Sequence, residues 1–121
     1  MIENWPGLIA GMNGAVRELR HASPEVMKTF SDMSQAAHAG SALDAKTKEL
    51  MALAIGVATR CAPCIAYHVE GAMKHGASRA EIAETLGMAI YMGAGPSVMY
   101  AAQALEAASQ MAAKQAATMA T

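Results

Sequence analysis

The chain has 121 residues, the size of one domain with a single modest core. Its formal net charge is −1 and it has no run of Lys or Arg, which argues against a nucleic-acid partner because phosphate neutralisation needs clustered positive charge. Hydrophobic residues make up 54% of the chain but aromatic residues only 4%, so the core must be built from aliphatic side chains and eleven methionines. So many apolar residues on a short chain predict that some helix faces are buried against other subunits.

The first residues, Met1–Pro6, have neither a basic n-region nor an apolar h-region, so we expect no secretory signal and a cytoplasmic protein. The stretch Thr85–Leu105 has no charged residue and is long enough to span a bilayer. Glycines and a proline at Gly93–Ser97 interrupt it, so we expect two buried helices joined at the glycines and no membrane span.

The N-terminal segment, residues 1–22, contains several glycines and predicts only a short helix, starting near Asn13. Ser23–Glu25 then offers an N-cap, a proline at the first helical position and an acid in the first turn. The helix that follows should run to about Ala39 and end at Gly40.

The central region predicts two further helices. Asp44 can cap the first, whose apolar residues recur at helical spacing and which Arg60 closes. The second should begin at Cys61 and end near Gly76, since glycine suits the left-handed position after a helix.

The C-terminal region predicts a pair of helices and a tail. Ser78–Glu81 has the form of a capping box, and Gly95–Pro96 opens a last helix that extends beyond Ala108. Residues 111–121 are expected to form a frayed, Ala-rich tail. Residues 23–110 would then be an all-α domain whose short connections make neighbouring helices roughly antiparallel.

The two cysteines of the chain are spaced as Cys61-Ala62-Pro63-Cys64, with His68 four residues on. With Cys61 at the N-cap, the three side chains fall on one stripe of the helix, because each residue advances about 100°. A helix N-terminus lowers the pKa of a thiol and favours the nucleophilic thiolate. Such a thiolate can attack the O–O bond of a peroxide and give a sulfenic acid, which the second cysteine converts to a disulfide. An external dithiol must then restore the pair.

Glu49 lies early in the preceding helix. If that helix packs against the one carrying Cys64 and His68, the carboxylate can orient the imidazole and hold or pass a proton. From its spacing alone, Glu49 could equally be an exposed acid that pairs with Lys46 or Lys48.

The spacing Glu49-x11-Cys61-x2-Cys64-x3-His68 resembles the core motif of the AhpD-like alkylhydroperoxidases of the carboxymuconolactone decarboxylase superfamily. The resemblance extends over roughly residues 24–108. It implies an all-α fold assembled as an obligate homo-oligomer, a trimer or hexamer. It also implies a peroxidase without metal or other cofactor, reduced by a dihydrolipoamide-bearing or thioredoxin-like partner. By position, Cys64 would be the attacking thiol, Cys61 the resolving thiol, and Glu49 and His68 the proton relay.

The sequence departs from this family pattern at Pro63, where well-studied members carry a histidine that belongs to the relay. A general thiol–disulfide oxidoreductase is therefore the alternative within enzymes. A zinc-binding or purely structural assembly protein is the alternative of another class, with Cys61, Cys64 and His68 as three ligands. The fourth ligand would then be Glu49, His38, water or another subunit. Outside such a site, His21, His38 and His75 are predicted to be solvated residues at helix ends.

Overall fold

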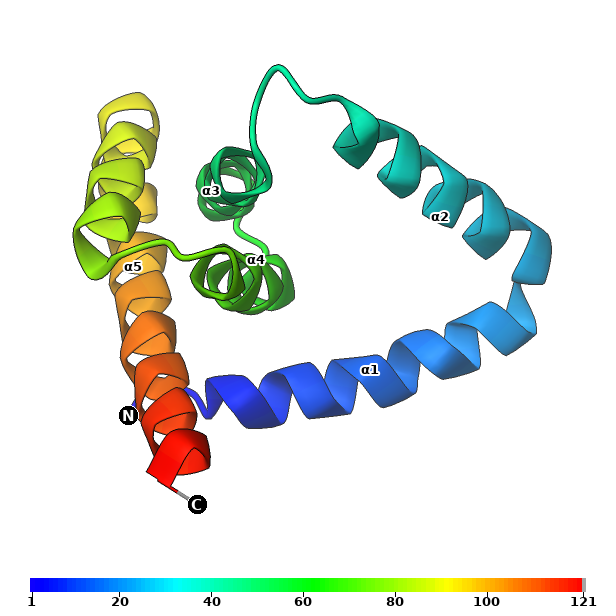
Figure 1. Cartoon of the computed structure of the whole chain (residues 1–121), viewed down its shortest axis with the longest axis horizontal. Helices are drawn as coiled ribbons and strands as arrows, with labels where there is room; N and C mark the ends of the chain where they lie inside the picture. The colour runs from blue at the N-terminus through cyan, green and yellow to red at the C-terminus, as the bar shows by residue number, and fades with distance from the viewer. Residues whose placement is uncertain (121) are drawn as a thin grey trace.

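The computed structural model describes residues 1–120, which form five helices and no strand (Figure 1). This confirms the all-α prediction. The helices are α1 (Trp5–Ala22), α2 (Pro24–Ala39), α3 (Ala45–Ala58), α4 (Ala62–Lys74) and α5 (Arg79–Ala120). Within the described residues, no helix is long and apolar enough to cross a membrane.

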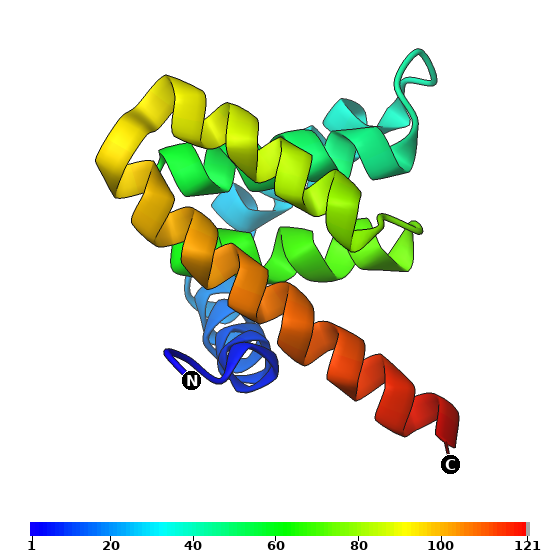
Figure 2. The ribbon, with the colours of Figure 1, turned by 90° about the vertical axis from the view of Figure 1, so that its left-hand side faces the viewer.

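Helix α5 consists of two arms rather than one rod. Ala94 has non-helical backbone angles, φ 54° and ψ −137°, and the chain reverses its direction there. Figure 2 shows the two arms folded back on each other. The break predicted at the glycines of residues 93–97 is therefore present.

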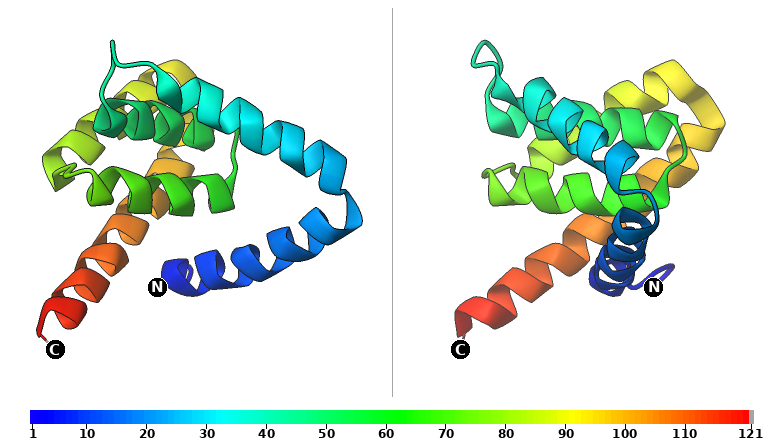
Figure 3. Two further views of the ribbon diagram at one scale, coloured as in Figure 1. Left: turned by 45° about the vertical axis from the view of Figure 1, so that its right-hand side comes forward. Right: turned by 90° about the vertical axis from the view of Figure 1, so that its right-hand side faces the viewer.

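The core lies between α3, α4 and the two arms of α5. Its fully buried members include Leu53 of α3, Ile65 and Val69 of α4 and Ile82 of α5. Helix α1 crosses beneath α4 and contributes Trp5. Helix α2 diverges from the rest of the molecule after a bend at Ser23 (Figure 3), and none of its sixteen residues, all of them described, is buried.

The predicted helix ends at the centre of the chain are confirmed. Asp44 accepts a hydrogen bond from the Thr47 amide at 2.8 Å, and Gly76 takes φ 87° after α4. The amide groups of Ser78 and Glu81 each bond to the other residue's side chain, at 2.9 and 3.1 Å, as a capping box requires.

Both ends of the chain are more helical than predicted. Helix α1 begins at Trp5 instead of near Asn13, because the Asn4 side chain caps the Gly7 amide at 3.1 Å. Trp5 is fully buried and its indole N–H donates to Glu106 at 2.9 Å, which fixes this start. At the other end, α5 continues to Ala120 where fraying was expected, in keeping with the high helix propensity of alanine. Thr121, the last residue of that expected tail, lies outside the described residues.

The turn between α3 and α4 fixes the position of the first cysteine. Arg60 adopts the left-handed conformation, φ 60°, that glycine usually supplies after a helix. Its amide bonds to the Val57 carbonyl at 3.1 Å, and the Cys61 amide bonds to the Gly56 carbonyl at 3.0 Å. Cys61 is thus held by the end of α3 while it caps the start of α4.

Candidate active site

The two cysteines form a disulfide at the N-terminus of α4. Their Cα atoms lie 5.2 Å apart, and the Cys64 amide donates to the Cys61 sulfur at 3.2 Å. Both residues are partly exposed, so the pair is open to small reactants. Cys61 is the N-cap and Pro63 lies in the first turn, as the sequence predicts. The two sulfurs are therefore bonded to each other within the first turn of α4.

Packing of α3 against α4 brings Glu49 to His68. Glu49 Oε2 lies 2.8 Å from His68 Nδ1, and the two side chains are 14% and 31% exposed. Because a carboxylate accepts, Nδ1 carries a proton and donates it, and in the neutral ring Nε2 then holds the lone pair. His68 follows Cys64 by one helical turn, so this base lies on the cysteine side of α4. The structure thus places all four predicted site residues at the junction of α3 and α4.

The lysines that offered an alternative partner for Glu49 are engaged elsewhere. Lys46 pairs with Glu81 of α5 at 2.7 Å, and this hydrogen bond raises the pKa of Lys46 and lowers that of Glu81. Lys48 donates to the carbonyl groups of His38 and Gly40. Within the described residues, neither lysine pairs with the Glu49 carboxylate.

Two glycines make room for the site, and neither was predicted from the sequence to belong to it. A Cβ atom on Gly71 would overlap Oε2 of Glu49 and lie 2.8 Å from its Cδ, so the carboxylate occupies the space that a side chain would fill. A Cβ on Gly56 would lie 3.3 Å from the Cβ of Cys64, where α3 and α4 approach closely. Gly71 follows His68 by three residues, and this spacing within a helix was the available signal.

The histidine at the end of α2 also reaches the site. His38 Nε2 lies 3.7 Å from Oε1 of Glu49, the oxygen that His68 does not use. The sequence predicts a solvated helix-end residue here, and the His38 side chain is indeed 51% exposed. Its contact with Glu49 was missed because it depends on how the loop after α2 folds back to α3.

The family model for carboxymuconolactone decarboxylases matches residues 24–107, which include the whole of this site. The chain belongs to the carboxymuconolactone decarboxylase family. An uncharacterised protein of Cupriavidus necator is 40% identical over 87 residues, covering 72% of this chain and 77% of its own. An uncharacterised protein of the cox locus of Paracoccus denitrificans is 36% identical over 93 residues, covering 77% of this chain and 84% of its own.

Two solved structures of this family share the fold. An apo carboxymuconolactone decarboxylase family protein of Legionella pneumophila superposes with a TM-score of 0.85 at 46% identity, covering 88% of this chain and 96% of its own. A family protein of Thermotoga maritima, for which a part in the antioxidative response has been suggested, superposes with a TM-score of 0.82. It is 26% identical and covers 91% of this chain and 94% of its own. The AhpD-like resemblance read from the sequence agrees with this membership.

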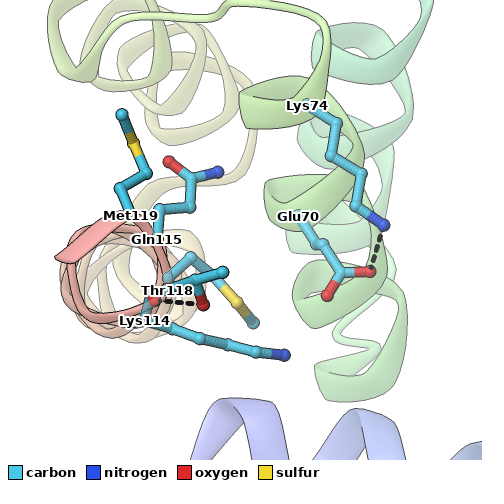
Figure 4. A pocket seen from close by; sticks show the side chains of 7 residues that line it. Glu70, Lys74, Lys114, Gln115, Thr118 and Met119 are labelled. Carbon is cyan, nitrogen blue, oxygen red and sulfur yellow. Dashed lines mark hydrogen bonds and ion pairs between the residues drawn. The ribbon is translucent and has the colours of Figure 1, made fainter. Parts of the chain in front are cut away.

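In this member of the family, an apolar groove lies away from the cysteines. A groove of about 260 Å³ runs between the second arm of α5 and the C-terminal half of α4 (Figure 4). Met111, Gln115 and Met119 line one side, and Glu70 and Lys74, which pair at 3.4 Å, line the other. No residue of the cysteine site lines this groove, so we assign it no part in the chemistry.

A metal centre was the other class of site that the sequence allowed. Residues 1–120 contain no group of three or more His, Cys, Asp or Glu side chains arranged to hold a metal ion. The two sulfurs are bonded to each other in this structure, which removes the thiolates from a ligand set.

Proposed function

We propose that the protein is a cysteine-based peroxidase that reduces organic hydroperoxides through a Cys61/Cys64 dithiol–disulfide cycle. The observation that carries the proposal is a bonded cysteine pair at a helix N-terminus beside a paired Glu49 and His68. This combination supplies a nucleophile, a resolving thiol and a base held in one tautomer.

The first step takes place at Cys64. Its thiol proton passes to Nε2 of His68, and the thiolate attacks the distal oxygen of the hydroperoxide. The O–O bond breaks, an S–O bond forms, and the alkoxide leaves with the electron pair and takes up the proton that His68 holds. The products are a sulfenic acid on Cys64 and one molecule of alcohol, so sulfur is oxidised and peroxide reduced by two electrons.

The second step takes place at Cys61. Its N-cap position stabilises a thiolate, because the Cys64 amide points at its sulfur and the helix dipole is positive there. The Cys61 thiolate attacks the sulfenic sulfur and displaces hydroxide, which leaves as water after protonation. With Cys64 as the attacking thiol and Cys61 as the resolving thiol, the proposed order agrees with the one that the family resemblance implies.

The disulfide must then be reduced by a dithiol from outside the protein. We propose a dihydrolipoamide-bearing or thioredoxin-like partner, whose two thiols are oxidised as Cys61 and Cys64 are restored. The cytoplasm keeps such dithiols reduced, and we propose that the protein works there.

The proposed order of attack is tested by trapping the intermediate. Reduced Cys61→Ser protein is mixed with cumene hydroperoxide and dimedone, and the adduct is located by mass spectrometry. We expect a sulfenic adduct on Cys64 and a much smaller yield on Cys61 in the Cys64→Ser protein. Intact hydroperoxide and no adduct in either variant would refute the peroxidase proposal, and an adduct only on Cys61 would reverse the two roles.

A general thiol–disulfide oxidoreductase is the second candidate. Pro63 favours this second candidate, because proline at this position cannot give a proton to the alkoxide that leaves in peroxide reduction. Disulfide exchange depends less on such a proton donor. The two candidates are separated by competition. Reduced protein is offered equal concentrations of cumene hydroperoxide and a small aromatic disulfide, and the faster reaction identifies the function.

We also propose that the protein acts as a homo-oligomer, a trimer or hexamer. Helix α2 presents Val26, Phe30 and Met33 at helical spacing, and they are 66%, 56% and 61% exposed. Met88 and Met92 on the first arm of α5 are 61% and 78% exposed. A single chain leaves this apolar surface in water, and a second copy would cover it. Light scattering on purified protein should give three or six times the chain mass, and a monomer at micromolar concentration would contradict the proposal.

A further inference from the structure

A polar pocket lies between α1 and the N-terminal half of α4, apart from the apolar groove. Its volume is about 380 Å³, within the range of pockets that hold small molecules. Its lining residues are Asn13, Val16, Arg17, Arg20 and Tyr67. Figure 3 shows α1 passing beneath the half of α4 that carries the cysteines. The pocket and the disulfide therefore lie on the same half of this helix.

Tyr67 connects this pocket with the cysteine pair. Each residue advances about 100° around a helix, so Tyr67 projects about 60° to one side of Cys64 and His68 about 40° to the other. On the His68 side the neighbouring helix is α3, whose Glu49 bonds to the imidazole. On the other side it is α1, whose Asn13 side chain accepts a hydrogen bond from the Tyr67 hydroxyl. Because side chains three residues apart have Cβ atoms about 5–6 Å apart, the wall of the pocket begins next to Cys64.

Two arginines give the pocket its positive charge. Arg17 and Arg20 are three residues apart on α1, so they share one face of that helix. Among residues 1–120, neither guanidinium has a carboxylate within 4 Å or a hydrogen-bond acceptor. The negative end of the α1 dipole favours a cation in the last turn, which accounts for Arg20. It does not account for Arg17, which precedes that turn and lines the same pocket.

The neutral residues of the pocket add a further donor. Asn13 Oδ1 accepts from the Tyr67 hydroxyl, and the amide N–H groups of Asn13 have no partner in the part of the chain that the structure describes. Each guanidinium presents a planar fork of N–H groups that matches the two oxygens of a carboxylate. The lining contains no acidic residue. Two unpaired forks and an amide donor around one pocket favour an anionic ligand.

We propose that this pocket binds a carboxylate of the substrate, and that the natural substrate is an organic hydroperoxide that carries one. The inference rests on the proposed peroxidase function and names its substrate class. Arg17 and Arg20 hold the carboxylate, Val16 contacts the hydrocarbon, and the hydroperoxide group extends past Tyr67 to the sulfur of Cys64. An acidic surface of the reducing partner is the alternative occupant. Oxidation of the reduced protein in a single turnover distinguishes the two, because it needs no partner.

The test compares two hydroperoxides that differ in charge at a distance from the reacting group. They are the para-carboxylate of cumene hydroperoxide and the methyl ester of that acid. Reduced protein is mixed with each compound, and the rate of a single turnover is measured by rapid quenching and thiol counting. The acid-to-ester rate ratio of wild type should be roughly tenfold higher than that of Arg17→Gln/Arg20→Gln, since an exposed ion pair contributes up to about fivefold. Intrinsic reactivity of the two compounds cancels in this comparison.

A charge removed elsewhere separates a binding site from long-range attraction between charges. Arg79 begins α5, donates to the Ser109 hydroxyl at 3.0 Å and does not line the pocket. The single variants Arg17→Gln and Arg20→Gln should each lower the acid-to-ester ratio roughly threefold, and Arg79→Gln should keep the wild-type ratio. Equal ratios in wild type and the double variant would overturn the inference, and so would an equal decrease in Arg79→Gln.

A binding measurement distinguishes failure of this inference from failure of the proposed function. The tertiary alcohol that corresponds to the carboxylate hydroperoxide has no O–O bond, and its binding to the oxidised protein is followed by NMR titration. We expect the double variant to bind this alcohol roughly tenfold more weakly than wild type. If wild type shows this difference but leaves both hydroperoxides intact, the peroxidase proposal fails and the pocket is still a carboxylate site. Equal binding by wild type and the double variant would overturn the inference whether or not the hydroperoxides react.

Discussion

The substitution Gly71→Ala should slow the reaction at the cysteines while hardly changing the stability of the fold. A Cβ atom at this position would overlap the Glu49 carboxylate, which must therefore retreat by about 1 Å in Gly71→Ala. The contact between Glu49 Oε2 and His68 Nδ1 is 2.8 Å, and a retreat of this size takes it beyond hydrogen-bonding distance. The imidazole then loses the partner that fixes its tautomer.

The same substitution costs the fold little. Alanine is favoured over glycine inside a helix by about 1 kcal/mol. Loss of a hydrogen bond between partly exposed groups costs about as much. We therefore expect the free energy of unfolding to change by less than about 1 kcal/mol. The rate of oxidation by cumene hydroperoxide should nevertheless fall roughly 100-fold, the usual effect of a 1 Å misplacement in a catalytic site.

The assay is single-turnover oxidation of the reduced protein, followed by rapid quenching and thiol counting, with thermal unfolding measured alongside. The control is Gly11→Ala on α1, where no described atom outside the adjoining helix backbone lies within 4 Å of the added Cβ. It should react like wild type and melt a few degrees higher. A Gly71→Ala protein that is folded and reacts at the wild-type rate would refute a role for the Glu49–His68 contact.

Three other predictions concern stability. Hydrogen bonds from the Ile2 amide and other N-terminal donors lower the pKa of Glu106. The contribution of Glu106 to stability is therefore complete above about pH 4.5 and is lost as the pH falls below that value. The fluorescence emission of Trp5 should shift to the red in this range, and a Glu106→Gln protein that shows the same step would contradict this cause. Arg60→Gly should raise the free energy of unfolding by about 1 kcal/mol, because it relieves the left-handed conformation, and an unchanged or lower melting temperature would oppose that reasoning. Reduction of the disulfide between Cys61 and Cys64 should lower the free energy of unfolding by no more than about 2 kcal/mol, because the loop it closes is short. If the helical circular dichroism at 25 °C were lost on reduction, the disulfide would be a structural one and not a redox pair.

Local chemistry made much of this structure predictable. Asp44, Cys61 and the pair Ser78 and Glu81 mark helix starts through side-chain acceptors, and each lies where its residue type predicted. The contact of Glu49 with His68 needed one further assumption, that consecutive helices α3 and α4 pack side by side. A three-residue connection makes such packing the natural outcome.

The parts that could not be predicted depend on contacts between distant segments. The start of α1 is stabilised by Glu106, about a hundred residues further along the chain, which no local pattern reveals. His38 reaches Glu49 because Lys48 binds two carbonyl groups at the end of α2, and lysine spacing in a sequence gives no sign of this. From the sequence, Gly71 is a glycine that weakens a helix. Only the structure shows that the Glu49 carboxylate lies where a side chain at this position would be.

Thiols are counted in fully reduced protein before and after one equivalent of cumene hydroperoxide, which tests whether the cysteine pair reduces peroxides. If it does, two thiols should disappear per chain, one molecule of cumyl alcohol should form, and the new disulfide should join Cys61 to Cys64. Two free thiols beside unreacted hydroperoxide would contradict it.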